Sequence, residues 1–396
     1  MKILQLCLRF PFPPVDGGGM AMASTAKGLK KIGVDLHIAA LNTTKHFATE
    51  QSVKTAQREF KISAFKIDNR ITPKNTLLNL LSGKAFHVTR FYNKNVAKQI
   101  AEILKHNNFD AVVFESLFMA PYLNLVKEVS HAKTILRSHN IEYQIWERVS
   151  SETNNWVKKK YLKLQAKRLK KYEETITPKF DLIAAISPND LNSYRKMGLG
   201  SKAFYLPFGI DAKPMAEKFE KSEFKIGHIG SMDWIPNQEG IRWFLKNVWP
   251  LINKEQLTCE FAGRHMPKDI VEASGHPLKV IGEVEHSEEF LKSLDLLIVP
   301  LRSGSGVRIK VLESMAMGVP IVATKIGFEG IGVKNKESII EANSAAEFAD
   351  AINKAKQNQK KLDLMAQNAG EYLSNNHSPK ATATLLVNTI KNGIAK

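Results

Sequence analysis

The stretch Val299–Gly332 decides the fold; it reads VPLRSGSGVRIKVLESMAMGVPIVATKIGFEGIG. The apolar run that leads into it, Leu294–Val299, predicts a strand of a buried parallel sheet. A small-residue loop at Ser303–Gly306 follows, and then a helix over Val307–Met317 that Gly318 closes in the C′ position. Free N–H groups and the helix dipole both favour an anion where a glycine loop enters a helix. The sequence therefore predicts an anion site here.

Side chains on this helix sharpen the prediction. Gly306, Lys310 and Glu313 are spaced by four and three residues, so they share one helix face. That face suits a nucleotide diphosphate, with Lys310 on the phosphates, Glu313 on the ribose hydroxyls and Arg308 as a bidentate phosphate ligand. An exposed ion pair between Lys310 and Glu313 has the same spacing and stays open as an alternative. The backbone ligands expected beside them are Gly304, Ser305, Gly306 and Val307.

The same stretch resembles the C-terminal nucleotide-binding segment of family-4 retaining glycosyltransferases of the GT-B fold, in the subgroup G-S-G-x-R-x-K-x-x-E-x-x-A-x-G-x-P-x-V. The resemblance implies catalytic roles for Arg308, Lys310 and Glu313. Many members carry a Glu-x7-Glu pair whose second glutamate binds the ribose, and Glu313 matches that second position. Ser305 stands at the first position, so the donor-sugar contacts of that first glutamate are not implied here.

Composition and length predict a multi-domain globular protein. The 396 residues suffice for two or three domains, and 43% hydrophobic with 24% charged residues is an ordinary globular balance. Cys7 and Cys259 lie in apolar runs, so we expect buried thiols of a reducing compartment. The amino-terminal segment lacks the pattern of a signal peptide, and no run approaches the length of about 20 apolar residues that spans a bilayer. We therefore expect a cytoplasmic protein.

The positive charge is concentrated in the first half of the chain. Residues 1–206 hold 33 Lys and Arg against 16 Asp and Glu, or +17, whereas residues 207–396 hold 24 against 23, or +1. Such a concentration of positive charge in one half of the chain indicates a polyanionic partner: nucleic acid, an anionic membrane or a phosphorylated substrate. A generally basic proteome is the alternative, although it would be expected to raise both halves.

The chain opens as a doubly wound α/β domain. A strand at Ile3–Leu8 is followed by Asp16–Gly19, a helix from about Met20 to Lys31 and a strand at Asp35–Leu41. The glycines do not match G-x-G-x-x-G, so a dinucleotide fold fits poorly. The resemblance implies that this glycine loop approaches the donor diphosphate and sugar, and a purely structural tight turn is the alternative. The glycines concerned are Gly17, Gly18 and Gly19.

A second polar cluster follows the predicted strands Asp110–Phe114 and Lys133–Arg137. It is Ser138–Glu142, just beyond a carboxyl strand end, where open α/β sheets bind ligands. His139 is the candidate for contact with the transferred sugar or for proton handling, and it resembles the first-domain histidine of the family. A histidine that merely caps a loop is the alternative.

The densest charge run is Trp156–Ile176, WVKKKYLKLQAKRLKKYEETI. Its apolar residues recur at helical spacing and lysines cover the rest, which predicts a basic amphipathic helix. Such a helix can lie on an anionic membrane, on the inner face, or receive a pyrophosphate-lipid acceptor. A solvated surface helix is the open alternative. Aromatic residues are not interleaved with the basic ones, so we expect no nucleic-acid partner.

The repeated strand–glycine–helix pattern predicts two domains. The first covers residues 1–206, with Leu182–Ser187 as its last strand and the helix at about 379–396 crossing back to it; the second covers 207–378, after a linker that begins at Tyr205. In the second domain, G-S-M-D-W-x-P-N at 230–237 again resembles the glycosyltransferase subgroup. Many members hold the diphosphate with an Arg and a Lys of this loop, whose places correspond to Ser231 and Asn237 here. Arg308 and Lys310 are expected to replace that charge.

These observations together predict an α/β protein of the GT-B fold, with two doubly wound Rossmann-like domains facing each other across a cleft. We expect a retaining glycosyltransferase of polysaccharide biosynthesis. It would move a sugar from a nucleotide-diphosphate donor to a lipid-linked or cell-surface glycan precursor, with no cofactor and no metal. A non-catalytic nucleotide-binding or membrane-associated scaffold and a GT-B sugar-nucleotide epimerase are the alternatives.

Overall fold

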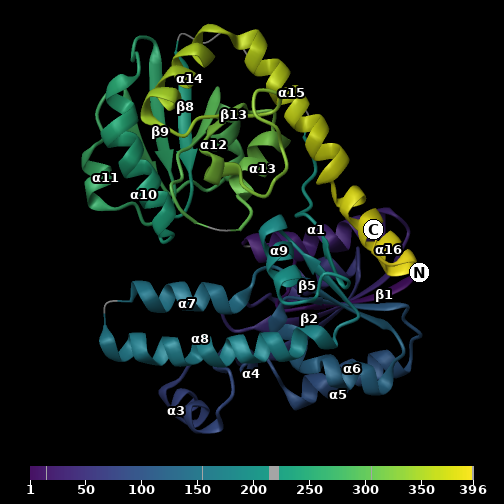
Figure 1. Ribbon diagram of the computed structural model, residues 1–396. Coiled ribbons are helices and arrows are strands. Elements are labelled where there is room, and N and C mark those ends of the chain that lie inside the picture. Colours follow the sequence, from purple (N-terminus) through teal and green to yellow (C-terminus); the bar gives the residue numbers. More distant parts are fainter. Residues whose placement is uncertain (15, 154, 214–222, 305, 395–396) are drawn as a thin grey trace. The chain divides into compact units, whose positions relative to one another are not determined.

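The computed structural model describes residues 1–14, 16–153, 155–213, 223–304 and 306–394. The chain forms two compact units. Unit 1 is Met1–Gly209 together with Pro379–Lys396, and unit 2 is Ile210–Ser378. Each unit is an α/β layer structure of its own (Figure 1).

Unit 1 is built on a parallel sheet with the strand order β3-β2-β1-β4-β5-β6-β7. The order reverses between β1 and β4, which makes their carboxyl ends the expected ligand site of this sheet. The expectation that residues 182–187 form the last strand is wrong, because Ala203 pairs with Ile183 and extends the sheet into what looked like a linker. The strands are β1 (Lys2–Cys7), β2 (Asp35–Thr43), β3 (Lys61–Ile67), β4 (Ala111–Glu115), β5 (Lys133–Ser138), β6 (Leu182–Ala185) and β7 (Ala203–Tyr205).

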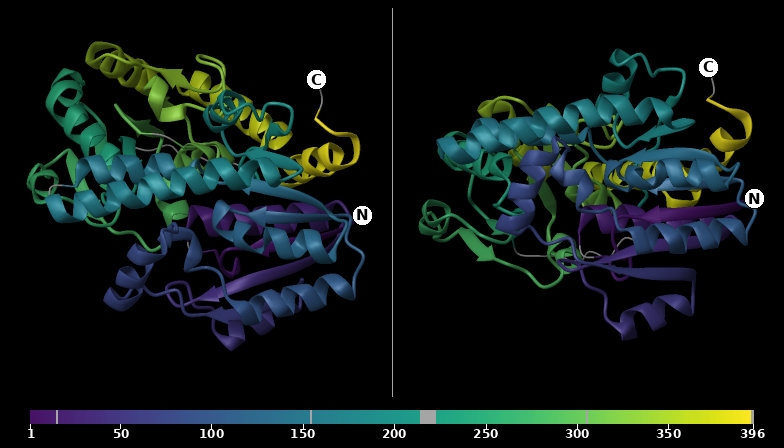
Figure 2. Two further views of the ribbon diagram at one scale, coloured as in Figure 1. Left: turned by 60° about the horizontal axis from the view of Figure 1, so that its bottom comes forward. Right: turned by 90° about the horizontal axis from the view of Figure 1, so that it is seen from below.

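Helices cover both faces of this sheet. Met22 and Leu386 belong to the core on one face, under α1 and α16, and Leu123 and Leu169 to the core on the other. Helices α7 and α8 pack together and reach beyond the strands (Figures 1 and 2). The helices are α1 (Gly17–Lys31), α2 (Glu50–Gln57), α3 (Pro73–Ser82), α4 (Phe86–Thr89), α5 (Lys94–Lys105), the 3-10 helix η1 (Leu117–Tyr122), α6 (Leu123–Val129), α7 (Glu142–Glu152), α8 (Trp156–Ile176), the 3-10 helix η2 (Thr177–Lys179), α9 (Pro188–Lys196) and α16 (Pro379–Asn392).

The glycines after β1 are not a loop. Helix α1 already begins at Gly17, because Asp16 caps it and accepts the Gly19 N–H at 2.9 Å. The predicted glycine loop with a helix from Met20 is therefore wrong, and the glycines form the first helical turn. Further along the same helix, a Cβ on Gly28 would lie 2.1 Å from the Pro379 carbonyl oxygen, which shows how closely α16 packs on α1.

Unit 2 contains a second parallel sheet, with the order β10-β9-β8-β11-β12-β13 and a reversal between β8 and β11. Its strands are β8 (Phe224–Ile229), β9 (Leu257–Ala262), β10 (Leu278–Gly282), β11 (Leu296–Val299), β12 (Ile321–Ala323) and β13 (Ile340–Glu341). Its helices are α10 (Ile235–Trp243), the π-helix η3 (Phe244–Val248), the 3-10 helix η4 (Trp249–Leu251), α11 (Lys268–Glu272), α12 (Ser287–Ser293), α13 (Ile309–Ala316), the 3-10 helix η5 (Lys325–Phe328), α14 (Ala345–Gln357) and α15 (Gln359–Asn376).

The loop before α13 is longer than the sequence indicates. Gly304 and Gly306 adopt φ values of +115° and +84°, which keep the chain out of the helical region. Arg308 is consequently the N-cap, and α13 begins at Ile309 instead of Val307. At the other end Gly318 has φ +68°, which confirms its predicted C′ role.

Cys7 and Cys259 are free and buried, as predicted, and burial raises the pKa of both thiols. Both are therefore held as neutral thiols inside the two sheets. In the part of the chain that the structure describes, no helix combines the length and apolar character needed to cross a bilayer.

Candidate functional site

Lys310 is the centre of a polar cluster in unit 2. It lies in the first turn of α13, and its Nζ donates to Asn237 Oδ1 at 2.9 Å and lies 2.9 Å from His228 Nε2. Asn237 sits in the first turn of α10 and donates through Nδ2 to the Ser231 carbonyl oxygen at 2.8 Å. The cluster therefore joins β8, α10 and α13 at the point where the strand order reverses.

The tautomer of His228 follows from its partners. Its Nδ1 lies 2.9 Å from the carbonyl oxygen of Ile298, on β11, and a carbonyl only accepts, so Nδ1 carries the proton. Nε2 is then a lone-pair acceptor for the Lys310 ammonium. Burial, and next the Lys310 charge, lower the pKa of His228 well below its ordinary value. The imidazole is thus a neutral acceptor that orients Lys310.

Lys310 itself is a desolvated cation. Burial, with a further contribution from the Arg308 charge, lowers the pKa of Lys310 to about 7. Its hydrogen-bond acceptors, an amide oxygen and an imidazole nitrogen, are both neutral. An anion placed here would raise the pKa of Lys310 and bind tightly for the same reason. A Cβ on Gly230 would lie 2.6 Å from both Lys310 Nζ and Asn237 Nδ2, so the site needs glycine there.

Glu313 is half-buried one turn further along α13. Burial raises its pKa, while the charges of Lys213 and Lys310 oppose that shift. The alternative of an exposed ion pair is wrong, because the Lys310 ammonium is directed at His228 and Asn237 instead. Glu313 thus offers a carboxyl group on the same helix face as Lys310.

Arg308 lies in the glycine loop. Its guanidinium donates to the Gly306 carbonyl oxygen and stacks over Trp234, 5.0 Å from the ring centroid. A Cβ on Gly304 would lie 2.8 Å from the Trp234 ring, so the loop needs glycine for that stacking. Arg308 is only 4% exposed, so its side chain packs inside the loop in addition to contributing a positive charge.

Unit 1 carries a second polar cluster at its own reversal point, around the buried carboxylate Glu115 at the end of β4. Its Oε1 accepts from Gln5 Nε2 at 2.7 Å, and its Oε2 lies 3.3 Å from Arg137 Nη1 and 2.7 Å from His139 Nε2. Burial alone would raise the pKa of Glu115, but the Arg137 charge and the His139 hydrogen bond lower this pKa to about 2.

The ionised Glu115 fixes His139. A carboxylate only accepts, so Nε2 of His139 carries a proton, and in the neutral form of the ring Nδ1 would be a lone-pair acceptor. An acceptor nitrogen suits a sugar hydroxyl. His139 is therefore oriented by a buried carboxylate.

The first turn of α1 adjoins an ion pair. Arg9 Nη1 lies 2.5 Å from Asp16 Oδ2 and 3.0 Å from His46 Nε2. A Cβ on Gly18 would lie 2.6 Å from Arg9 Nη2. The carboxylate that caps the helix is thus oriented by a cation at the carboxyl end of β1.

A pair of buried carboxyl groups lies under α7. Glu173 of α8 accepts the N–H groups of Glu142 and Tyr143 at 3.2 and 3.1 Å and so satisfies the first turn of α7. Burial, with the neighbouring Glu173, raises the pKa of Glu142 to about 8, and burial raises that of Glu173 to about 7. Both carboxyl groups are therefore harder to ionise than an exposed glutamate.

The predicted site residues fall in both units. Gly17, Gly18, Gly19 and His139 are in unit 1, whereas Ser231, Asn237, Gly304, Gly306, Val307, Arg308, Lys310 and Glu313 are in unit 2. Ser305 lies outside the described residues. Ser231 joins the Lys310 cluster through its carbonyl oxygen only. No group of three or more His, Cys, Asp or Glu that could hold a metal occurs among the residues described.

His228 and Glu115 were not predicted from the sequence. Each is a polar residue at or near the carboxyl end of an otherwise apolar strand, FKIGHI for β8 and AVVFE for β4. In an open parallel sheet that position marks ligand sites, so the signal was present in both strands.

The chain resembles known proteins along its length. Residues 223–358 match the family model described as "Glycosyl transferases group 1". A relative of Klebsiella pneumoniae, an "uncharacterized 44.6 kDa protein in cps region", is 24% identical over 400 residues, covering 96% of this chain and 97% of that protein.

Solved structures of glycosyltransferases share the fold. Anabaena Alr3699/HepE in complex with UDP-glucose matches with a TM-score of 0.63 and 14% identity over 99% of both chains. Sucrose-phosphate synthase of Thermosynechococcus elongatus matches with a TM-score of 0.68 and 13% identity, over 99% of this chain and 98% of that one. The lipopolysaccharide outer core galactosyltransferase WaaB matches with a TM-score of 0.65 and 12% identity over all of both chains. The fold is GT-B, as predicted, and together with the family model it supports a glycosyltransferase.

Proposed function

We propose that this protein is a retaining family-4 glycosyltransferase that moves a sugar from a nucleotide-diphosphate donor to a lipid-linked or cell-surface glycan precursor. The family model over residues 223–358 and the GT-B fold support the transferase class. The relative in a cps region favours polysaccharide biosynthesis. A donor of this kind fits the UDP-glucose bound by the similar HepE.

The observation that carries the proposal is the Lys310 cluster. A partly desolvated ammonium, oriented by Asn237 and a neutral His228, stands at the strand-order reversal of unit 2. Glu313 follows one turn later on the same helix. This pairing of a cation with a carboxyl group matches the diphosphate and ribose of a nucleotide. The proposal assigns the diphosphate to Lys310 with Arg308, and the ribose hydroxyls to Glu313.

Charge stabilisation of the leaving diphosphate is the chemistry this site would supply. As the glycosidic bond to the phosphate oxygen breaks, negative charge grows on the diphosphate, and Lys310 and Arg308 would stabilise it. His139 in unit 1 would accept a hydrogen bond from the transferred sugar through Nδ1. In a same-face displacement, the proton of the attacking hydroxyl passes to the departing phosphate oxygen. No metal and no cofactor enter this proposal.

Nucleotide binding tests the proposal directly. Thermal shifts of the full chain with UDP, GDP, ADP, CDP and dTDP should single out one nucleotide, since a ligand at 100 times its dissociation constant adds about 2.7 kcal/mol. Glu313→Ala and Lys310→Ala should remove the shift, whereas the exposed Lys246→Ala should retain it. If no nucleotide shifts the wild type at millimolar concentration, the proposal is wrong. Binding without sugar transfer to any acceptor would favour the scaffold alternative.

A further inference from the structure

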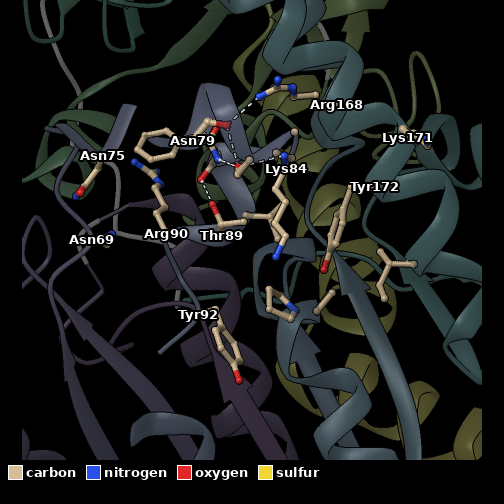
Figure 3. A pocket seen from close by; sticks show the side chains of 18 of the residues that line it. Asn69, Asn75, Asn79, Lys84, Thr89, Arg90, Tyr92, Arg168, Lys171 and Tyr172 are labelled. Atoms are coloured by element: carbon tan, nitrogen blue, oxygen red, sulfur yellow. Dashed lines mark hydrogen bonds between the residues drawn. The ribbon is translucent and has the colours of Figure 1, made fainter. Parts of the chain in front are cut away.

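Unit 1 contains a cavity of about 950 Å³ that the proposed donor site does not use. Residues of helices α3, α4 and α8 and of the 3-10 helix η1 line it, and Figure 3 shows many of their side chains. Arg168 of α8 holds one wall in place, because its guanidinium donates to the carbonyl oxygens of Asn79 and Leu80 at 3.1 and 2.9 Å. The cavity is therefore a built part of unit 1.

Cations dominate its lining. Among the described residues that line it, a single carboxylate, Asp68, is present, and Arg70 bonds it at 2.6 Å. Figure 3 shows the Lys84 and Tyr172 side chains extending in the same direction into the open space. The cationic side chains around it are Arg70, Lys84, Arg90, Arg168, Lys171 and Lys179. A concave surface with this excess of one sign concentrates ions of the opposite sign.

Arg90 is the most desolvated of these cations. It follows α4, and its guanidinium stacks on Phe91 with 4.7 Å between the guanidinium carbon and the ring centroid. Burial lowers its pKa. In the described part of the chain, its buried Nε has no hydrogen-bond partner and no carboxylate pairs with it. A half-buried guanidinium without a counter-ion is costly unless an anion completes it.

A second cavity of about 410 Å³ shares Asn69, Arg70 and Arg90 with the first. It reaches Arg9 and His46, at the carboxyl ends of β1 and β2. The two cavities are therefore adjacent at these shared residues, and the smaller one extends toward the sheet edge that carries the first turn of α1. A ligand held at Arg90 could extend its other end to that edge.

We propose that the larger cavity binds a phosphate or diphosphate group of the acceptor substrate, with Arg90 as its central ligand. That the bound group belongs to an acceptor rests on the proposed function, whereas the anion site itself rests on the geometry alone. Spread cations and a forked guanidinium match the several oxygens of a phosphate better than a single carboxylate does. Such a group arrives either on a lipid headgroup or on a soluble glycan phosphate.

Calorimetry with inorganic diphosphate tests the site in the full chain. Titrations in a Lys310→Ala, Arg308→Gln background disable both proposed diphosphate ligands of the donor site, so they report on unit 1 whether or not the protein binds nucleotides. Arg90→Gln should weaken diphosphate binding at least ten-fold. Because Arg90 is half-buried, the exposed pair Lys84→Gln with Lys171→Gln is the second test and should weaken it by a similar factor.

Arg195→Gln, an exposed arginine of α9 outside the cavity, is the charge-matched control and should leave the affinity unchanged. Equal diphosphate affinity in the background protein, in Arg90→Gln and in the double lysine variant would overturn the inference. The absence of diphosphate binding at low salt would also overturn it. Failure of the proposed function would appear separately, as loss of any nucleotide shift in the wild type.

Vesicles identify the source of the phosphate. Phosphatidylcholine vesicles with and without phosphatidylglycerol are sedimented with the wild type and with Arg90→Gln. Retention on phosphatidylglycerol that free diphosphate displaces and Arg90→Gln abolishes assigns the phosphate to a lipid headgroup. Retention that is independent of Arg90, with diphosphate binding still weakened by Arg90→Gln, assigns it to a soluble acceptor. Both results support the cavity as the anion site.

Discussion

Nζ of Lys310 lies 2.9 Å from Nε2 of His228, and the Nδ1–H of His228 donates to the Ile298 carbonyl oxygen. The lysine on α13 is thereby oriented by a histidine on β8 that is itself held by β11. A histidine in this tautomer accepts from the ammonium and cannot compete with it for an anion. The pair holds a cation in position without neutralising its charge.

Nucleotide affinity should depend on pH through Lys310. Its pKa is about 7 in the empty site and rises when a diphosphate binds, so binding takes up a proton above pH 7. Affinity should fall by up to about ten-fold per unit above pH 7. Calorimetry at pH 8 in buffers of different ionisation enthalpy measures the uptake directly. An affinity that is flat from pH 6 to 9 would contradict this role of Lys310.

Gly230→Ala should disable the donor site without unfolding unit 2. The new methyl group would sit 2.6 Å from Lys310 Nζ and Asn237 Nδ2, and the flexible lysine would be displaced. We expect at least a ten-fold loss of nucleotide affinity with a small change in melting temperature. Gly275→Ala is the matched control, because a Cβ there meets nothing within 4 Å. Equal affinities in the two variants would show that the Lys310 position is unimportant.

Glu115→Gln should destabilise unit 1. It leaves Arg137 buried without its counter-charge, which costs about 3–5 kcal/mol. The folded pKa of Glu115, about 2, lies below its unfolded value, so its contribution is present above about pH 4.5 and is lost as pH falls toward 2. Thermal unfolding between pH 3 and 7 should show the difference between variant and wild type shrinking with acid. Glu102→Gln, on the exposed surface of α5, should change stability by less than about 0.5 kcal/mol.

Glu142→Gln should stabilise the protein at alkaline pH, whereas Glu115→Gln destabilises it. The folded pKa of Glu142 is raised to about 8, so its favourable contribution is complete below the unfolded value near 4.5 and is lost as pH rises through 8. A glutamine mimics the protonated acid at every pH. The melting temperature of the variant should therefore exceed that of the wild type at pH 8.5 and equal it near pH 5. Glu174→Gln, at the exposed residue next to Glu173, should show no such pH-dependent difference in melting temperature from the wild type.

The fold was largely predictable because the parallel strands are short apolar runs separated by glycine and helix-cap signals. The three errors have different causes: a side-chain cap, the backbone conformation of two glycines, and the shortness of a strand. Asp16 caps α1 and turns the predicted glycine loop into helix, and the positive φ values of Gly304 and Gly306 delay α13. β7 was missed because AFY is too short to be distinguished from a linker without its partner β6.

The sequence indicated several residues of the candidate site, but not His228, not Glu115 and not the contacts that join these residues. Spacing placed Lys310 and Glu313 on one face of α13, whereas only the three-dimensional arrangement shows that Lys310 is joined to Asn237 and His228. The contact of Lys310 with His228 spans 82 residues of sequence. No local pattern encodes a pairing across two strands and a helix. The same holds for Glu115 and His139, which meet only because β4 and β5 are adjacent.

Unit 2 is an insertion in unit 1, and this sets the order in which the two are completed during translation. The ends of unit 2 meet, since the Ile210 N–H donates to the His377 carbonyl oxygen at 2.7 Å. Helix α16, which packs on α1, is synthesised only after the whole of unit 2. On the ribosome unit 2 can therefore finish folding first, whereas the first-made unit waits with the α1 face of its core uncovered. Until α16 emerges, the apolar residues that it covers stay exposed, which makes the incomplete chain prone to aggregation.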